Sequence, residues 1–165
     1  MDMKFVGAFV GFAILALIVI NLSYPLAVSE SEEVVYYQVT ATNRTDMLTQ
    51  LSELGPKGAA GLTEWQVRWN WVCKVNIHTT ISLPQHTNLD ALSTAQRESW
   101  QNFVQKLHLH ERLHQFNGQS AARDIARHYC INADFISRYW MQKDVIFDYV
   151  SRHGQRDGVV LYWSN

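Results

Sequence analysis

Cysteine, charge and repeated sequence are all scarce in this chain of 165 residues. It holds two cysteines and no Cys-x-x-Cys motif, so the cysteines do not indicate a zinc knuckle. The formal net charge of −1 provides no electrostatic footprint for nucleic acid, and no internal repeat or low-complexity tract is present. With 47% hydrophobic and 18% charged residues, the composition excludes a disordered protein and allows one domain with a sizeable core.

The two cysteines are Cys73 and Cys130. In an oxidising compartment they can form one disulfide bond, and two free buried thiols are the alternative. No further pattern in the sequence supports a cysteine nucleophile.

The first 29 residues differ in character from the rest of the chain. A lysine leads into an apolar run at residues 5–20, and a more polar segment then ends in small residues at Ala27 and Ser29. This order predicts a signal peptide over residues 1–29, and an uncleaved membrane anchor is the alternative. In both cases residues 30–165 are expected outside the cytoplasm as one domain, because positive charge precedes the apolar run and glutamates follow it. The domain is therefore expected to be secreted or periplasmic, with a tether to the inner membrane if the leader is kept.

Two segments have the composition and periodicity of strands. Residues 34–40 are β-branched and aromatic. From Trp65 to Leu83 apolar side chains alternate with polar ones, which indicates one buried and one exposed face. This run is too long for one ordinary strand, so we expect it to bend or fold into a hairpin before Pro84 ends it.

Helices are expected on both sides of this run. A short helix begins with Thr45 as its cap and ends at Gly55-Pro56. A capping box at residues 93–96 starts a helix that can run to Asn117, with Gly118 placed to terminate it. Two further helices over residues 120–130 and 133–152, the second capped by Asn132, and a last strand over residues 158–163 complete the pattern. The order predicts an α+β fold with three C-terminal helices packed on a small, mainly antiparallel sheet.

The stretch HLHERLH contains the H-E-x-x-H pattern of zinc peptidases. His110 and His114 lie four residues apart and share a helix face with the apolar Leu107 and Phe103. Two imidazoles on a buried face need partners, and one zinc ion could bind both. Glu111 lies beside this face, where its carboxylate can take a proton from a zinc-bound water.

Another interpretation of the same stretch needs no metal. The two histidines could be core residues whose ring nitrogens are satisfied by carboxylates, with Glu111 as a surface acid. His108 points away from the shared face and is expected at the surface in either case.

A catalytic zinc site usually has three protein ligands, and the third is not adjacent in sequence. The longer pattern H-E-x-x-H-x-x-G-x-x-H is not met, because Asn117 and Ser120 occupy its glycine and last histidine positions. The remaining candidates are Asp124, His128, Asp134, Asp144, Asp148 and His153.

His153 is the third ligand that we predict. It extends an apolar stripe of the last helix, formed by Ile146, Tyr149 and Val150, and therefore stands at the inward edge of a helix end. Asp124 and Asp134 are the alternatives. They are less suited, because Asp124 lies on the polar side of its helix and Asp134 stands in a first turn, where the helix dipole favours a carboxylate in any case.

Several short motifs follow one another in a fixed order along the chain. They are Tyr37-x-Val39, Gly55-Pro56, Trp65-x-Val67-x-Trp69, Cys73, Leu83-Pro84, His110-Glu111 with His114, and a last motif from Phe147 to Gly154 that contains Asp148 and His153. This set resembles a bacterial family of uncharacterised, predicted secreted zinc-dependent proteases. The family's last motif resembles Tyr-Asp-x-x-Thr-x-His-Gly, so Phe147 and Ser151 depart from it. The resemblance implies a zincin-like fold with bound Zn²⁺ and supports His153 as a ligand.

These observations predict a zinc-dependent peptidase that hydrolyses peptide or protein substrates outside the cytoplasm. Zn²⁺ is held by His110, His114 and His153, and Glu111 is the general base. A zinc amidase that acts on the cell wall and a non-catalytic zinc-containing envelope binding domain are the alternatives. The strand near residues 65–75 could pair with a peptide backbone, although a plain core strand is the simpler interpretation. No nucleic-acid partner is expected.

Overall fold

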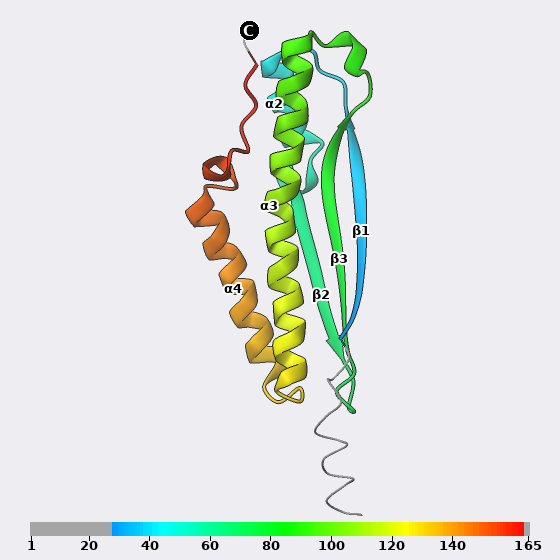
Figure 1. Ribbon diagram of the computed structural model, residues 1–165, viewed down its shortest axis with the longest axis vertical. Coiled ribbons are helices and arrows are strands. Elements are labelled where there is room, and N and C mark those ends of the chain that lie inside the picture. The colour runs from blue at the N-terminus through cyan, green and yellow to red at the C-terminus, as the bar shows by residue number, and fades with distance from the viewer. Residues whose placement is uncertain (1–27, 164–165) are drawn as a thin grey trace, which may run out of the picture.

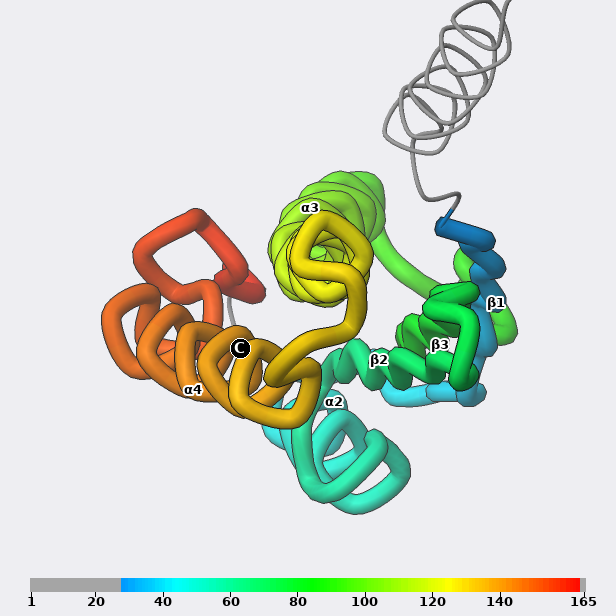
Figure 2. Tube along the Cα trace, turned by 90° about the horizontal axis from the view of Figure 1, so that it is seen from below, coloured from blue at the N-terminus to red at the C-terminus, as the bar shows by residue number. Residues whose placement is uncertain are grey.

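The computed structural model describes residues 28–163, in which a long helix lies against a three-stranded sheet and a second helix lies on the outer side of the first (Figures 1 and 2). The predicted α+β class is confirmed. The leader predicted for residues 1–29 falls outside the described residues, except for Val28 and Ser29, which open the first strand. Among the helices of residues 28–163, none combines the length and apolar character needed to cross a bilayer.

The sheet consists of β1 (Val28–Val39), β2 (Leu62–Trp69) and β3 (Val75–His86), in the order β1-β3-β2. β2 and β3 pair antiparallel, but β1 pairs in parallel with β3 along its whole length. The sheet is therefore mixed, and the prediction of a mainly antiparallel sheet is wrong. The segment between β1 and β3 returns the chain to the starting end of β1, so that both strands run in the same direction.

The long alternating run folds into a hairpin whose turn is organised by Asn70. Its Oδ1 accepts hydrogen bonds from the backbone N–H groups of Val72, at 3.2 Å, and Lys74, at 2.8 Å. Such local bonds are the reason that Asn favours turns. Pro84 does not end β3, because past Ser82 this strand has only β1 as a partner and a missing N–H is tolerated there.

A short helix, α2 (Arg44–Glu53), follows β1 as predicted. Asn43 caps it instead of Thr45, and the Asn43 Oδ1 accepts a hydrogen bond from the N–H of Asp46 at 2.9 Å. Met47 and Leu51 are the side chains that α2 buries in the core. The helix ends before Gly55, as the sequence indicated.

The longest element is α3 (Thr94–Arg127), a single helix of 34 residues. The predicted capping box is present, since Ser93 and Gln96 each accept a hydrogen bond from the other's backbone N–H. The predicted break at Gly118 is wrong, and the separate helix over residues 120–130 is part of α3. Gly118 is buried against Trp65 of β2, where an added Cβ would lie 2.5 Å from the indole Cγ. The glycine therefore permits close packing and does not end the helix.

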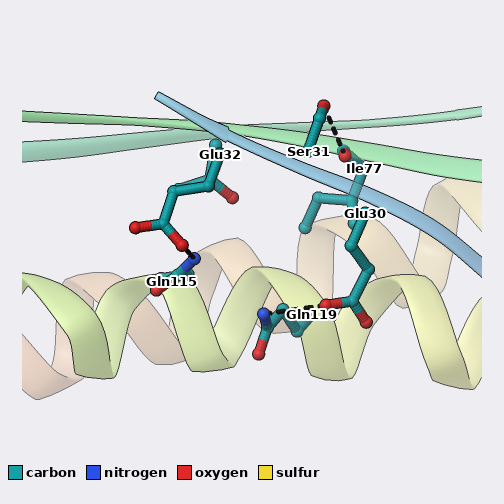
Figure 3. Close-up of a pocket in the computed structure, with 7 residues that line it drawn as sticks. Glu30, Ser31, Glu32, Ile77, Gln115 and Gln119 are labelled. Carbon is teal, nitrogen blue, oxygen red and sulfur yellow. Dashed lines mark hydrogen bonds between the residues drawn. The ribbon is translucent and has the colours of Figure 1, made fainter. Parts of the chain in front are cut away.

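Polar side chains hold the first half of β1 on α3, around a small hollow (Figure 3). Gln115 Nε2 donates to Glu32 Oε2 at 2.6 Å, and Gln119 Nε2 donates to Glu30 Oε2 at 2.9 Å. Arg123 adds an ion pair to Glu30 at 3.0 Å. Glu30 and Glu32, which follow the apolar run in sequence, are thus partners of α3.

The second long helix, α4 (Ala133–Ser151), packs on α3 with a face that the sequence did not indicate. The apolar stripe that was expected to point inward is exposed, since Ile146, Tyr149 and Val150 are each more than half accessible. α4 instead turns Asp144 and Asp148 towards α3. Residues 94–163, the described C-terminal part, contain two α-helices, α3 and α4, and not three as predicted.

The last described segment is extended but pairs with no described strand, so the predicted strand over residues 158–163 is wrong. Its alternating side chains Val159, Leu161 and Trp163 are buried in the core at the start of α3. Trp163 Nε1 donates to the carbonyl oxygen of Gln96 at 3.0 Å. A short 3-10 turn, η3 (Gln155–Asp157), connects α4 to this tail.

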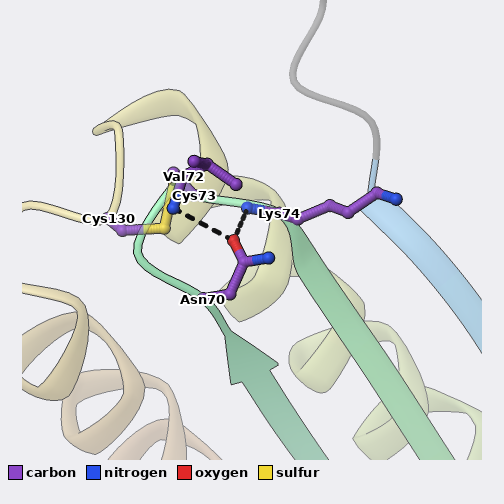
Figure 4. The surroundings of a disulfide bond; sticks show 5 residues. All are labelled: Asn70, Val72, Cys73, Lys74 and Cys130. Carbon is purple, nitrogen blue, oxygen red and sulfur yellow. Dashed lines mark hydrogen bonds between the residues drawn. A yellow bond between two sulfur atoms is a disulfide. The ribbon is translucent and has the colours of Figure 1, made fainter.

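Cys73 and Cys130 form the predicted disulfide bond, with a Cα–Cα distance of 5.6 Å (Figure 4). It joins the β2–β3 turn to the loop between α3 and α4. The two segments are 57 residues apart in sequence, so the bond closes a long loop and restricts the unfolded chain.

The close packing of Gly118 on Trp65 gives the first testable prediction. We expect Gly118→Ala to lower the free energy of unfolding by about 1–2 kcal/mol, because an overpacking cost of about 1–3 kcal/mol exceeds the gain of up to about 1 kcal/mol in helix propensity. Chemical denaturation followed by circular dichroism measures the change. Ser120→Ala, in the same helix but only half-buried, is the control and should not destabilise. A Gly118→Ala protein as stable as the wild type would contradict the proposed role of the glycine.

Candidate metal centre

The buried face of α3 changes from apolar to polar in its middle. Trp100, Phe103 and Leu107 precede this stretch and join the core at one end of the molecule, while Ala122 and Ile125 follow it and join the core at the other. Between them His110, Glu111, His114 and Gln115 are all at most 7% exposed. Four buried polar side chains in succession are costly unless each finds a partner.

Both histidines have Asp148 of α4 as a hydrogen-bond partner. Asp148 Oδ1 lies 3.2 Å from His110 Nε2 and 3.0 Å from His114 Nε2. One ligand atom from each of the three residues falls within 4.8 Å of the others, so the group could hold a metal ion. Tetrahedral zinc ligands at ~2.0–2.2 Å from the ion stand roughly 3.3–3.6 Å apart, so the two nitrogen–oxygen distances are slightly shorter than this spacing.

The far nitrogen of each imidazole is also bound by a carboxylate. His110 Nδ1 lies 3.3 Å from Asp157 Oδ2 in η3, and His114 Nδ1 lies 3.2 Å from Asp144 Oδ1 in α4. Asp144 is in turn held by Trp65 Nε1 at 2.5 Å and Asn117 Nδ2 at 2.6 Å. Carboxylates on the outer nitrogen fix the ring orientation of metal-binding histidines and increase their basicity.

Apolar contacts complete the packing of the two rings. Phe147 stacks on His110 with ring centroids 4.9 Å apart and meets His114 edge-on at 5.1 Å. Gly154 also lies close to His110. An added Cβ there would be 2.6 Å from Val159 Cγ2 and 3.1 Å from His110 Cγ, and the φ of 78° is left-handed. The backbone conformation and the close approach of Val159 and His110 therefore favour glycine after His153.

Glu111 lies beside the two histidines and faces the start of β2. Its backbone oxygen accepts a hydrogen bond from Thr63 Oγ1 at 3.0 Å, and an added Cβ on Gly61 would come within 2.8 Å of its Oε1. Burial raises the pKa of the Glu111 carboxyl above its ordinary value, while the neighbouring histidines oppose the shift. A carboxylate with a raised pKa is a stronger proton acceptor than an exposed one.

The structure brings together three of the residues singled out in the sequence, His110, Glu111 and His114. The side chain of His153 is 82% exposed, and its Nδ1 lies 3.7 Å from Asp148 Oδ2. It does not belong to the group of converging ligand atoms, and its role as a ligand stays a prediction. Asp124 accepts a hydrogen bond from Trp140 Nε1 at 2.9 Å, and Asp134 lies exposed in the first turn of α4.

Asp144 and Asp148 were candidate ligands but were not preferred, because the apolar stripe of α4 was expected to point inward, and Asp157 was not a candidate. Asp144, Phe147, Asp148 and Ser151 follow the i, i+3, i+4, i+7 spacing of one helix face. His110, His114 and Asn117 have the same spacing in α3, so two polar stripes of matching period were present in the sequence. Asp157 has no such signal, because it reaches His110 from a turn.

The fold and the site together define the class of this protein. It is an α+β protein in which two buried histidines and a half-buried aspartate form a cluster of potential metal ligands. The chain belongs to a bacterial family described as "Bacterial protein of unknown function (DUF922)", whose model matches residues 34–154. This range includes both histidines, Glu111 and Asp148. No curated protein and no solved structure matches the chain. The family description assigns no activity, so the protease function expected from the sequence remains to be proposed from the site.

The carboxylates change the protonation of the cluster in the metal-free protein. Burial alone would lower the pKa of His114, but hydrogen bonds and charge from Asp144 and Asp148 outweigh it and raise this pKa from 6.5 to about 10. The histidines in turn hold the pKa of Asp148 well below its usual range, against the effect of its burial.

The raised pKa of His114 predicts a pH dependence of stability. Between pH 6.5 and 10 folded His114 keeps a proton that the unfolded chain releases, so its stabilisation is complete below 6.5 and is lost as the pH rises towards 10. We expect the free energy of unfolding of metal-free protein to fall by about 1–4 kcal/mol between pH 6.5 and 9.5. Urea denaturation in a chelating buffer measures this slope. His114→Gln is the matched control and should show a much flatter slope, and equal slopes would contradict the assignment.

Proposed function

We propose that this protein is a zinc-dependent peptidase that acts outside the cytoplasm. The observation that carries the proposal is the convergence of His110 Nε2 and His114 Nε2, both on buried side chains, with Oδ1 of the half-buried Asp148. The Glu111 carboxyl stands at the adjacent position of the same helix. This set matches the two-histidine, one-carboxylate ligation and separate glutamate of many zinc hydrolases. The HExxH helix against a sheet also supports a zincin-like fold.

His110, His114 and Asp148 would hold the zinc ion. When bound, zinc is a Lewis acid that lowers the pKa of water and polarises a carbonyl oxygen. Asp157 and Asp144 contact the outer nitrogens of the two imidazoles, so that both Nε2 atoms face Asp148 Oδ1. Phe147 covers the rings and excludes water from one side.

Glu111 is proposed as the general base. It would accept a proton from the water that attacks the peptide carbonyl and then deliver this proton to the nitrogen of the departing amine, so that the carboxylate is regenerated. Burial supports this role, because it raises the pKa of Glu111 towards the value that a base needs at neutral pH.

The position of β2 supports an extended peptide as substrate. β2 is an edge strand of the described sheet and passes directly beside the site, where Thr63 contacts Glu111 and Trp65 contacts Asp144. A peptide backbone can add to such an edge by main-chain hydrogen bonds. The sequence placed this pairing near residues 65–75, but only residues 62–69 form the strand and Asn70 begins the turn.

A location outside the cytoplasm is part of the proposal. The Cys73–Cys130 disulfide supports it, because such bonds persist in oxidising compartments. The apolar run at residues 5–20 agrees with export or tethering.

The role of Glu111 is tested by Glu111→Gln, which keeps the shape of the side chain and removes the base. We expect bound zinc to be retained and hydrolysis of an unstructured protein such as casein to fall by about 10²–10⁴-fold. Glu98→Gln, an exposed glutamate in the same helix, is the control and should leave the activity unchanged. Unchanged hydrolysis in Glu111→Gln would rule out its role as the base.

The third ligand is tested by zinc stoichiometry in three variants of the C-terminal region. We expect Asp148→Asn to lose most of the bound zinc, because it removes a charged ligand, while His153→Ala and the exposed control Asp134→Asn keep about one ion per chain. Metal analysis after reconstitution gives the stoichiometry, and circular dichroism confirms folding. Zinc lost in His153→Ala but kept in Asp148→Asn would show that the ligand predicted from the sequence is the right one.

A further inference from the structure

The end of the molecule that carries the disulfide bond exposes large apolar side chains. We call it the disulfide tip and define it as residues 70–74 and 127–138, which the Cys73–Cys130 bond joins (Figure 4). Trp71 at the hairpin turn is 94% exposed. The other exposed apolar members, each more than half accessible, are Val72, Tyr129, Ile131 and Phe135. A patch of this kind on a soluble surface indicates a contact with something apolar.

The backbone of the tip is constrained by hydrogen bonds and by the disulfide, in a conformation that leaves these side chains exposed. Asn70 closes the turn beneath Trp71 with two hydrogen bonds, and the disulfide fixes the turn to the opposite loop. Four non-glycine residues of the tip have left-handed backbone angles, with φ from 53° to 58°: Cys73, Tyr129, Cys130 and Asn132. Such conformations persist only where the surrounding structure enforces them. The exposure of Trp71 is therefore built into the fold.

The charge of the tip differs from that of the whole chain. Lys74, Arg127 and Arg138 oppose a single acid, Asp134, which gives the tip a formal charge of +3 − 1 = +2, whereas the whole chain carries −1. Arg127 also forms an ion pair at 3.4 Å with Asp124, which lies just outside the tip. Exposed aromatic and aliphatic side chains among basic residues suit the interface of an anionic bilayer, where Trp and Tyr are enriched and basic residues are attracted to the lipid phosphates.

The chain enters the folded domain at this same end (Figure 1). Val28, the first residue of β1, pairs with Val75 directly after the tip and packs in the cluster that contains both cysteines. Seven residues, 21–27, separate it from the apolar run at residues 5–20. Seven residues span at most about 25 Å, so a membrane that held the run would lie within reach of the tip.

We propose that the disulfide tip rests on the surface of an anionic lipid bilayer, with Trp71, Val72 and Ile131 inserted among the headgroups and Lys74, Arg127 and Arg138 close to lipid phosphates. The proposal does not depend on the peptidase function. The proposal also predicts how far the candidate metal centre lies from the bilayer surface. His110 lies 17 residues before Arg127 in α3, so an upright helix would place the centre roughly 25 Å from the bilayer surface.

The test uses the full chain reconstituted in vesicles of equal parts phosphatidylcholine and phosphatidylglycerol, with and without bromine on the acyl chains as a quencher of tryptophan fluorescence. The signal of Trp71 is the difference between the wild type and Trp71→Phe. We expect this difference to be blue-shifted and quenched by the brominated lipid, and to be quenched less in phosphatidylcholine alone. Equal quenching in the two lipids would overturn the role of the basic residues.

The control experiment places the reporter tryptophan in α4 instead of in the tip. The double variant Trp71→Phe/Tyr149→Trp places a tryptophan at a position that is 83% exposed in the structure, remote from the tip. We expect this tryptophan to remain unquenched. Equal quenching at both positions would mean that the bilayer lies along α4, and no quenching at Trp71 would mean that another protein or water covers the tip. Either result would overturn the proposal.

Discussion

Half-buried carboxylates hold α4 on α3 by hydrogen bonds, and the site depends on that attachment. The buried residues of α4, Ala133 and Ser151, lie at its two ends. Between them Asp148 binds the two histidines and Asp144 binds His114 and Asn117, while Trp140 of α4 binds Asp124 of α3. The groups that could hold a metal are therefore the same groups that position one helix on the other. A metal ion would replace hydrogen bonds that the protein already needs for folding.

Local chemistry allowed much of this structure to be predicted. The capping box at Ser93 and the shared face of His110 and His114 follow from residue types at fixed spacing, and the alternating pattern indicated a bend or hairpin. The disulfide was expected because the chain has two cysteines and a location outside the cytoplasm was predicted. Predictions from local sequence patterns were wrong where a contact with a residue distant in sequence determines the structure. Gly118 is a plausible helix terminator until Trp65 is placed beside it, and no local pattern specifies the parallel pairing of β1 with β3.

Asp148, the third candidate ligand, could not be preferred from the sequence for a related reason. The sequence of α4 contains an apolar stripe and a polar stripe, and the usual rule buries the apolar one. Here the opposing surface of α3 is polar, so the polar stripe faces α3 and Ile146, Tyr149 and Val150 remain exposed. His153 belongs to the exposed stripe, whereas Asp148 belongs to the stripe that faces α3. Only the pairing of two helices, each with polar residues at i, i+4 and i+7, distinguishes them.

The segment from Cys130 to Trp163, which carries Asp148, is attached to the rest of the domain at both of its ends. Cys130 fixes its beginning to the sheet, and the buried side chains from Val159 to Trp163 fix its end to the start of α3. Asp148 therefore has little conformational freedom to lose when it engages a ligand. Reduction of the disulfide would release one end, and the restored chain entropy would oppose ligand binding. The affinity of the candidate metal centre for an ion would therefore be thermodynamically linked to the redox state of a remote bond.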